Sequence, residues 1–196
     1  MHRIFIAINL PEKVKTELEK LEKEIESLFP PKLNRGMFRW VKKENLHITL
    51  LFIGSVRDEE IPKISQIVKD IAQSQKPFSL RIEKVSYGPP KKIPPRLIWV
   101  EVGRKPELSE IAKKLKKEMA ESGILRKVEQ REFSPHITLA RIKSFWWKRI
   151  EPEERPEIER EIALDFEVNS IEIMESKLKK TGAEYQILES AKFLDK

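Results

Sequence analysis

The tetrapeptide His-Ile-Thr-Leu occurs twice, at residues 47–50 and again at residues 136–139. The chain has three histidines in all, so two of them stand in the same local setting. On a β-strand, successive side chains point to opposite faces, which puts His47 and Thr49 on one face and the two aliphatic residues on the other. Each phrase therefore predicts an aliphatic pair anchored in a core and a polar pair that faces a cleft.

If the two phrases belong to two similar lobes, their polar pairs confront each other across one groove. This arrangement suits phosphodiester hydrolysis by in-line displacement. One neutral imidazole would remove a proton from water, and the other would protonate the departing sugar oxygen, since histidine has a pKa of about 6.5. The hydroxyls of Thr49 and Thr138 can donate to phosphoryl oxygens, where charge develops. The two phrases are too alike to indicate whether His47 or His136 is the base.

Structural roles and a metal site are the alternatives. A single histidine on a half-buried strand is usually a hydrogen-bonded structural residue, and a threonine on a strand is usually there as a good β-former. A duplication could preserve a purely structural phrase. Two histidines are too few for a metal site, and neither phrase holds an Asp or Glu at ligand spacing. With no cysteine in the chain, thiolate sites and disulfides are also excluded. We expect no metal and no cofactor.

Composition indicates a folded globular protein. Of the 196 residues, 39% are hydrophobic and 36% are charged. No apolar run approaches the ~20 residues of a membrane span, and the apolar patch near the N-terminus is too short for a secretory signal, so we expect a cytoplasmic location. The net charge of +7 suits a polyanionic partner and also an ordinary soluble surface. Abundant Lys and Glu with sparse Asn and Gln are typical of heat-adapted proteins.

Periodicity predicts about eight strands and three long helices. The expected helices span residues 11–28, 58–74 and 106–122. The expected strands lie near residues 3–10, 38–41, 46–54, 78–88, 97–103, 135–141, 164–178 and 184–193. Residues 29–37 and the proline-rich basic segment 89–96 are expected to be loops, and residues 143–160 to be irregular.

The elements do not alternate strictly, which favours an α+β fold over a doubly wound sheet. The repeated phrase lies nearly half the chain apart, and each half has a long helix and several strands. We therefore expect an internal duplication with two pseudo-symmetric lobes, each an antiparallel sheet with helices outside, and a cleft between them. Because no Ser- or Gly-rich linker separates the halves, residues 1–196 are expected to form one domain.

At these motifs the sequence resembles the 2H phosphoesterase superfamily, whose mark is a pair of H-x-[ST]-x motifs. It is most similar to the RNA 2′,3′-cyclic phosphodiesterase branch, also called the 2′-5′ RNA ligase family. The segments that carry the resemblance are "RIFIAINLP" at residues 3–11, "FRWVKKENLHITLLFIG" at 38–54 and "FSPHITLAR" at 133–141. Residues 143–160 and the C-terminal end match loosely.

The resemblance implies functional roles at six positions. His47 and His136 fall on the catalytic histidines, and Thr49 and Thr138 fall on residues that contact the phosphate. Arg141 falls on a basic residue expected to contact the substrate phosphate. Phe52, its counterpart in the first repeat, would line the nucleoside side of the groove or serve as a core aromatic.

The implied reaction needs no metal and converts a 2′,3′-cyclic phosphate end to a 2′-phosphate. Some members of the family also join or cleave 2′-5′ linkages, so this activity is one alternative. The other is a non-catalytic module that binds RNA ends. The expected partners are RNA ends or small cyclic or 2′-5′ nucleotides, with no membrane, and the expected oligomeric state is a monomer.

Several further residues have two interpretations. Arg39 and Trp40 precede the first motif and could approach the substrate, although Trp40 also suits a core. The segment "FWWKR" at 145–149 could be a stacking platform for bases or a hydrophobic plug between lobes. The loop 89–96 could steer RNA by its charge or act as a stiff connector. His2 stands apart from any motif.

Overall fold

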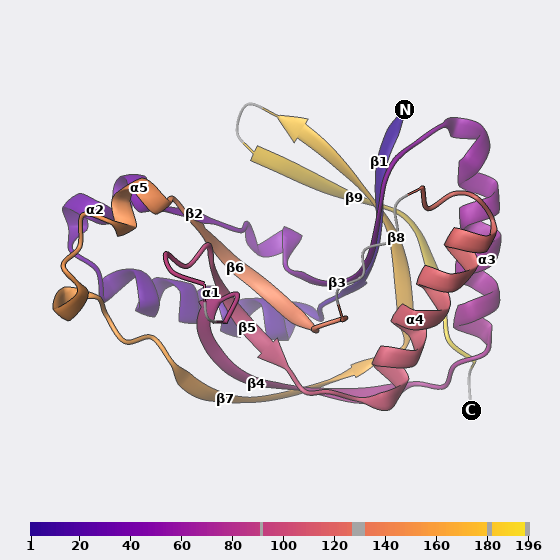
Figure 1. Ribbon diagram of the computed structural model, residues 1–196. Helices are drawn as coiled ribbons and strands as arrows, with labels where there is room; N and C mark the ends of the chain where they lie inside the picture. Colours follow the sequence, from indigo (N-terminus) through magenta and orange to yellow (C-terminus); the bar gives the residue numbers. More distant parts are fainter. Residues whose placement is uncertain (91, 127–131, 180–181, 195–196) are drawn as a thin grey trace.

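The computed structural model describes residues 1–90, 92–126, 132–179 and 182–194. Within these ranges, nine strands join in one antiparallel sheet, shown in Figure 1. The strands are β1 (His2–Asn9), β2 (Phe38–Trp40), β3 (His47–Val56), β4 (Phe78–Gly88), β5 (Leu97–Val102), β6 (His136–Ile142), β7 (Arg160–Val168), β8 (Ser170–Lys179) and β9 (Gly182–Lys192). The α-helices are α1 (Glu12–Ser27), α2 (Pro31–Met37), α3 (Ile61–Gln73), α4 (Pro106–Glu121) and α5 (Ser144–Trp147), and short 3-10 turns lie at Lys43–Asn45, Asp58–Glu60 and Pro152–Glu154.

The sheet has two matching halves. Outward from its centre the order is β3, β1, β8 and β9 in one direction and β6, β5, β4 and β7 in the other, while short β2 pairs with β6. In the first half the chain runs from β1 through α1 to β3, and in the second from β5 through α4 to β6. The motif strands β3 and β6 are therefore equivalent central strands. The expected α+β fold with two similar antiparallel halves is confirmed.

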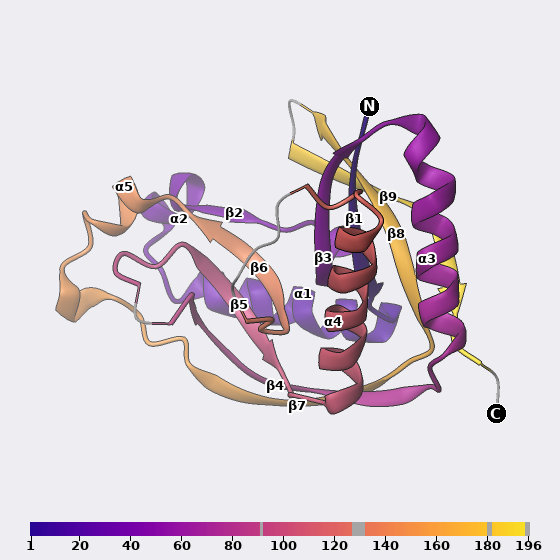
Figure 2. The same ribbon diagram turned by 45° about the vertical axis from the view of Figure 1, so that its right-hand side comes forward.

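The helices cross between the halves. Helix α4 packs on α3 and on β3, at the right of Figures 1 and 2. Helix α1 runs behind β4 and β5 in both views, and Glu24 of α1 forms an ion pair with Arg160 of β7. Each repeat thus places its long helix against strands of the other repeat. That residues 1–196 form one domain stays a prediction, which this exchange of helices supports.

The helices form where an apolar stripe recurs at helical spacing. In α1 the stripe includes Val14, Leu18 and Ile25, all buried, and Pro11 stands just before the first turn, where its missing N–H costs no hydrogen bond. One large apolar cluster runs beneath both halves of the sheet. No helix in the described ranges is long and apolar enough to cross a membrane.

Three local predictions were wrong. Residues 31–37, expected to be a loop, form α2, because prolines are tolerated in the first turn of a helix. The predicted strand at 164–178 is two strands, β7 and β8, divided at Asn169. Before this residue the chain pairs with β4, and after it the chain pairs with β1. The segment 143–160 includes the short helix α5, while the described part of 89–96 has no regular structure, as expected.

Candidate active site

The two motif strands lie side by side at the centre of the sheet. Ile48 of β3 pairs with Ile137 of β6 in antiparallel register. One step along this register in each direction places His47 opposite Thr138 and Thr49 opposite His136. Residues opposite each other share a face of the sheet, and diagonal neighbours lie roughly 7–8 Å apart, with their Cβ atoms somewhat closer. The four polar side chains therefore converge on one face, with the imidazoles on a diagonal.

Burial along both strands follows the predicted alternation. Ile48 and Leu50 of β3 are buried, as are their counterparts Ile137 and Leu139 of β6. The histidines and threonines between them are partly exposed. The aliphatic pairs anchor the strands in the core and leave the polar pairs facing outward.

The ring of His47 is held by two hydrogen bonds. Its Nδ1 lies 2.6 Å from the backbone oxygen of Asn45, and its Nε2 lies 2.9 Å from Oγ1 of Thr49. Because a carbonyl oxygen only accepts, Nδ1 carries the proton, and Nε2 of the neutral ring keeps its lone pair. Thr49 then donates to Nε2. The lone pair of Nε2 is thus directed at the hydroxyl of Thr49, which must turn away before His47 can take a proton from water.

The ring of His136 is held in the same way on one side only. Its Nδ1 lies 2.8 Å from the backbone oxygen of Ser134, again two residues earlier in the chain. In the described part of the chain, Nε2 of His136 has no hydrogen bond equivalent to the one between His47 and Thr49. The two sites share a tautomer but differ in what Nε2 meets.

Aromatic rings enclose both histidines. Phe5 and Tyr185 lie beside His47, with ring centroids 5.1 and 5.2 Å away. Trp99 lies beside His136, with centroids 4.6 Å apart. Burial lowers the pKa of His47 to about 4, although its hydrogen bond to Asn45 acts in the opposite direction. Burial also lowers the pKa of His136. Both rings are therefore neutral near pH 7 when no substrate is bound.

A β-bulge turns Phe52 toward the site. The register of β3 against β1 shifts by one residue between Thr49 and Leu51. In a strand without this bulge, Phe52 would lie on the face opposite His47, since five positions separate them. The bulge restores Phe52 to the His47 face, where it lies opposite Phe5. Phe52 is 66% exposed, so it is not a core aromatic.

A bulge at the equivalent place in β6 turns Arg141 toward the same site. The register of β6 against β5 shifts by one residue between Thr138 and Ala140. Arg141 is consequently exposed on the face that carries His136, five positions earlier. The two bulges show that the halves match in backbone irregularity as well as in sequence.

Asn45 and Lys15 support His47 from behind. Asn45 is 5% exposed, and its side chain bonds to strand β9, donating to the oxygen of Ala183 (3.0 Å) and accepting from the N–H of Tyr185 (3.3 Å). Lys15 is 6% exposed, and its Nζ donates to the backbone oxygen of Glu44 (3.1 Å). Its positive charge further lowers the pKa of His47. Sequence reasoning assigned no role to either residue, although Asn45 stands two positions before His47 in the quoted segment 38–54.

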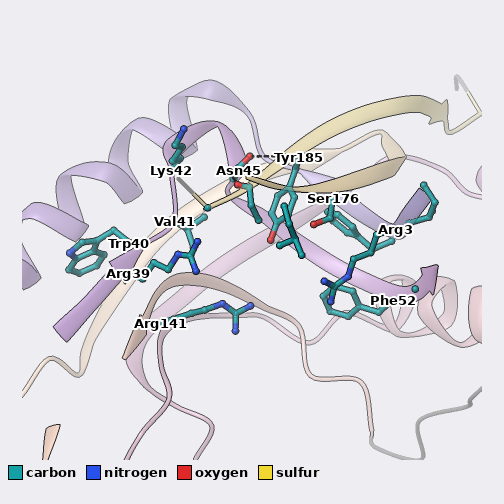
Figure 3. A pocket seen from close by; sticks show the side chains of 16 residues that line it. Arg3, Arg39, Trp40, Val41, Lys42, Asn45, Phe52, Arg141, Ser176 and Tyr185 are labelled. Atoms are coloured by element: carbon teal, nitrogen blue, oxygen red, sulfur yellow. Dashed lines mark hydrogen bonds between the residues drawn. The ribbon is translucent and has the colours of Figure 1, made fainter. Parts of the chain in front are cut away.

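A cavity of about 410 Å³ opens beside the motif strands (Figure 3). Phe52 and Arg141 line it together with Arg39 and Trp40, so the two residues before the first motif do reach this region. The motif histidines and threonines are not part of its lining. Sequence reasoning also missed Arg3, Phe5 and Tyr185 on its walls, because they belong to strands far from both motifs in the chain.

The segment 145–149 combines both interpretations. Trp147 is 4% exposed and packs against Tyr87 of β4, so it is a core residue, and a plug between the lobes stays a prediction. Phe145 is 63% exposed and carries the guanidinium of Arg149 over its ring at 4.9 Å. A role of Phe145 in stacking bases stays a prediction.

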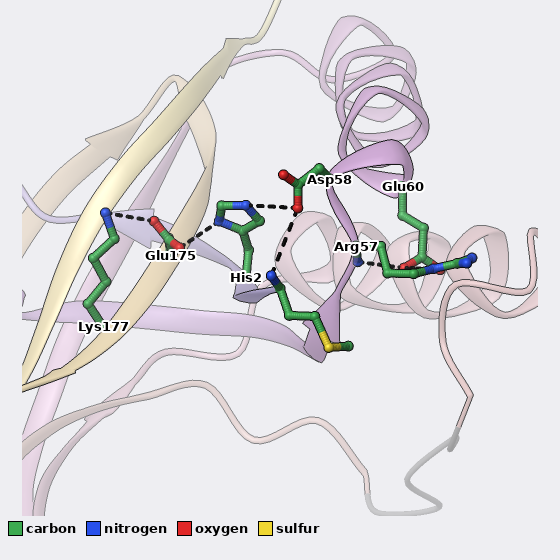
Figure 4. A network of polar contacts seen from close by, with 7 residues as sticks. His2, Arg57, Asp58, Glu60, Glu175 and Lys177 are labelled. Carbon is green, nitrogen blue, oxygen red and sulfur yellow. Dashed lines mark hydrogen bonds and ion pairs between the residues drawn. The ribbon is translucent and has the colours of Figure 1, made fainter.

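His2 has a different setting from the motif histidines (Figure 4). Its Nδ1 lies 2.7 Å from a carboxylate oxygen of Glu175, and its Nε2 lies 3.3 Å from one of Asp58. Glu175 also pairs with Lys177 at 3.2 Å. This network connects β1 to β8 and to the turn after β3. Across the described residues, no group of three or more His, Cys, Asp or Glu side chains is arranged to hold a metal ion.

Comparison with known proteins gives consistent matches over the whole chain. A family model described as LigT like Phosphoesterase matches residues 8–99 and 100–185, one match for each repeat. An RNA 2′,3′-cyclic phosphodiesterase of Thermotoga maritima is 31% identical over 195 residues, covering 97% of this chain and 95% of the relative. One of Aquifex aeolicus is 27% identical and covers 95% of both chains. A crystal structure of a Thermus thermophilus protein superposes with a TM-score of 0.79 at 28% identity, covering 97% of both chains.

Proposed function

Since the chain belongs to the family of LigT-like phosphoesterases, we propose that it hydrolyses RNA 2′,3′-cyclic phosphate ends to 2′-phosphates by metal-independent two-histidine catalysis. One observation carries the proposal. Two His-x-Thr phrases, one from each repeat, lie on paired antiparallel strands in a register that turns all four polar side chains to one face. The names of the relatives from Thermotoga maritima and Aquifex aeolicus support the choice of substrate.

The proposed reaction is a single in-line displacement. One histidine takes a proton from water through the lone pair of its Nε2, and the resulting hydroxide attacks phosphorus. The bond between phosphorus and the 3′ oxygen breaks, and the second histidine delivers its Nε2 proton to that oxygen. The product has a 2′-phosphate and a 3′-hydroxyl. Both Nδ1 protons stay with the backbone oxygens of Asn45 and Ser134, which keep the rings in the required tautomer.

The phosphoryl oxygens would be held by neutral and charged donors. Thr49 and Thr138 lie opposite the histidines across the paired strands and can donate to the non-bridging oxygens, where charge grows in the transition state. Arg141 would add a guanidinium. A bound phosphate anion also raises the pKa of nearby histidines, because it favours the imidazolium form. Substrate would thereby protonate one of two rings that are neutral in the free protein.

The same groups would serve 2′-5′ ligation, with a ribose 5′-hydroxyl in place of water as the nucleophile. They would also serve the reverse cleavage of a 2′-5′ linkage, in which the 3′-hydroxyl attacks phosphorus and the 5′ oxygen leaves with the proton from the second histidine. The cavity beside the motif strands favours this as a second candidate, because it offers room for another nucleotide next to the reacting phosphate. A third candidate is a module that binds RNA ends without chemistry. Nε2 of His136, which has no hydrogen bond among the described residues, argues against that role, since a purely structural imidazole would have both nitrogens bonded.

The test is incubation of the protein with a short RNA that ends in a 2′,3′-cyclic phosphate, in the presence of EDTA. We expect the cyclic end to open to the 2′-phosphate isomer, which phosphorus NMR or chromatography distinguishes from the 3′-phosphate. Loss of activity on chelation would contradict the metal-free mechanism. Tight binding of the RNA end with no conversion would identify a binding module instead.

The remaining expectations concern the location, the oligomeric state and the cofactor requirement of the protein. The cytoplasmic location, the monomeric state and the lack of a cofactor stay predictions. Gel filtration with light scattering checks the oligomeric state. Activity of protein purified from denaturant without any added ion or small molecule checks the cofactor prediction.

A further inference from the structure

Two arginines face each other on adjacent strands next to the candidate site. Arg39 of β2 lies directly opposite Arg141 of β6 in antiparallel register. Like charges in this position destabilise a sheet. In the ranges that the structure describes, no carboxylate forms an ion pair with either guanidinium. A phosphate group bound between the two guanidiniums would offset this repulsion.

A third arginine reaches the same cavity from the other half of the sheet. Arg3 of β1 is on the same face as Phe5, which lies opposite Phe52. Figure 3 shows Arg3 on the Phe52 side of the cavity and Arg39 with Arg141 on the other side. Lys42 is a fourth cation in the lining of the cavity, and the described residues of the lining include no Asp or Glu. The lining is therefore suited to a polyanion.

The backbone is shaped to admit the guanidinium of Arg39. A Cβ built at Gly182, the first residue of β9, would lie 2.9 Å from a terminal nitrogen of Arg39. Gly182 also has a φ of +132°, which L side chains rarely adopt. A glycine at this place meets both demands, and Arg39 rests against the backbone of β9 with its charge exposed to the cavity.

The cavity also offers aromatic surface on which a nucleobase can stack. Phe52 is 66% exposed on one wall, and Tyr185 is a further aromatic residue of the lining. Aromatic faces stack on nucleobases of any sequence, at about 1–3 kcal/mol per base. A volume of about 410 Å³ lies in the range of sites for small ligands. Cations around aromatic rings in such a space match one nucleotide unit with its phosphate.

We propose that this cavity binds the nucleotide that precedes the cyclic end, with Arg3 and Arg39 holding the phosphodiester between the last two nucleotides. The protein therefore prefers an oligoribonucleotide to a mononucleotide. The proposal rests on the proposed function, because it takes the reacting phosphate to lie at the motif histidines. Arg141, which lies on the motif strand β6, is assigned to the terminal phosphate and is left unchanged in the tests.

The first test compares two substrates that share the reacting group. Adenosine 2′,3′-cyclic phosphate has only the terminal nucleotide, whereas a tetraribonucleotide with the same cyclic end adds the preceding phosphates. Arg3→Gln and Arg39→Gln should each lower kcat/KM for the tetranucleotide about tenfold, and for the mononucleotide less than about twofold. Arg81→Gln removes the same charge from an exposed position of β4 outside the cavity. This control should change neither value.

The second test locates the phosphate. A methylphosphonate in place of the last phosphodiester removes its charge without shortening the strand. It should lower kcat/KM of the unaltered protein about tenfold, and that of the Arg3→Gln/Arg39→Gln double variant less than about twofold, because the interaction is already absent there. Equal losses in both proteins would overturn the proposal, as would equal effects of Arg39→Gln on the two cyclic substrates.

A binding measurement separates this proposal from the proposed function. Fluorescence anisotropy with a labelled tetranucleotide ending in a 2′-phosphate requires no turnover. If neither cyclic substrate is converted, the proposed function fails. The subsite still predicts about tenfold weaker binding by each variant and a salt dependence reduced by about one ion. Unchanged affinity and unchanged salt dependence in both variants would exclude it.

Discussion

The two motif regions share a backbone plan but differ in surroundings. In both, Nδ1 of the histidine bonds to the carbonyl two residues earlier, and a bulge follows the threonine. Around His47, however, Thr49 bonds to Nε2 and two aromatic rings close in. His136 meets one ring, that of Trp99, and is more open. The two repeats share the backbone contact of the histidine and the bulge after the threonine, while the environments of the two rings differ.

The supporting residues differ in the same sense. Asn45 is buried and bonded to β9, whereas its counterpart Ser134 is exposed. Trp99, in contrast, is fixed by its own neighbours, donating from Nε1 to Oγ of Ser86 (2.9 Å), which donates to Glu101 (3.2 Å). Both histidines bond to a backbone carbonyl, but His47 is flanked by the buried Asn45, whereas His136 packs against a tryptophan that a polar network holds. The same substitution made at equivalent positions of the two halves should therefore have unequal effects.

Removal of either imidazole is expected to have the largest effect. His47→Ala and His136→Ala should each lower kcat for a cyclic-phosphate RNA about 10³-fold, because each proton transfer contributes on the order of 10²–10⁴. The double variant should be little worse than either single variant, since the two groups act as a unit. Circular dichroism checks that the fold is intact. Near-normal turnover by one single variant would contradict the equivalence of the two histidines in catalysis.

Replacing the threonines should sharpen the difference between the halves. Thr49→Val removes a donor to the phosphate and also the bond to Nε2 of His47, whereas Thr138→Val removes a donor alone. Loss of one such donor lowers kcat about 10²-fold. We expect that loss for Thr138→Val and a several-fold larger one for Thr49→Val, together with a shifted pH–rate profile. Identical profiles for the two variants would show that the bond to His47 has no catalytic weight.

Asn45 and Ser134 test the supporting contacts through stability. Asn45→Ala leaves the oxygen of Ala183 and the N–H of Tyr185 without their partner. The free energy of unfolding should fall by about 1–3 kcal/mol. Ser134→Ala, at the exposed equivalent position, should change it by less than about 0.5 kcal/mol. Urea denaturation measures both values, and a comparable loss in the two variants would remove this distinction.

The smallest expected effect is on the pH dependence of stability. The folded-state pKa of His47 is lowered to about 4, while histidine in the unfolded chain titrates near 6.5. Between these values the unfolded chain binds the extra proton, so stability falls as pH drops from about 6.5 toward 4 and this contribution is lost at lower pH. His47→Gln should reduce the difference in urea midpoint between pH 7 and pH 5. Other groups titrate alike in both proteins, so an unchanged difference would mean that His47 is not held neutral by burial.

Much of the site followed from local pattern. The alternation within His-Ile-Thr-Leu gave the buried Ile48 and the outward His47, because side chains of a strand alternate with a period of two. The repeat gave the two matching halves. The pattern could not show the division of residues 164–178 at Asn169, because β7 and β8 continue similar alternation while pairing with strands of different halves. The prolines before α2 also led the sequence pattern to predict a loop at residues 29–37.

The sequence alone therefore determined that His47, Thr49, His136 and Thr138 come in two equivalent sets with their polar side chains turned out of the core, because residue type and strand alternation are local properties. Only the tertiary structure decided what surrounds them. The bulges that turn Phe52 and Arg141 to the active face depend on register against β1 and β5, and register is a property of paired strands. The opposition of Arg39 and Arg141, like the rings of Phe5, Tyr185 and Trp99 around the histidines, arises only when segments distant in the chain are brought together.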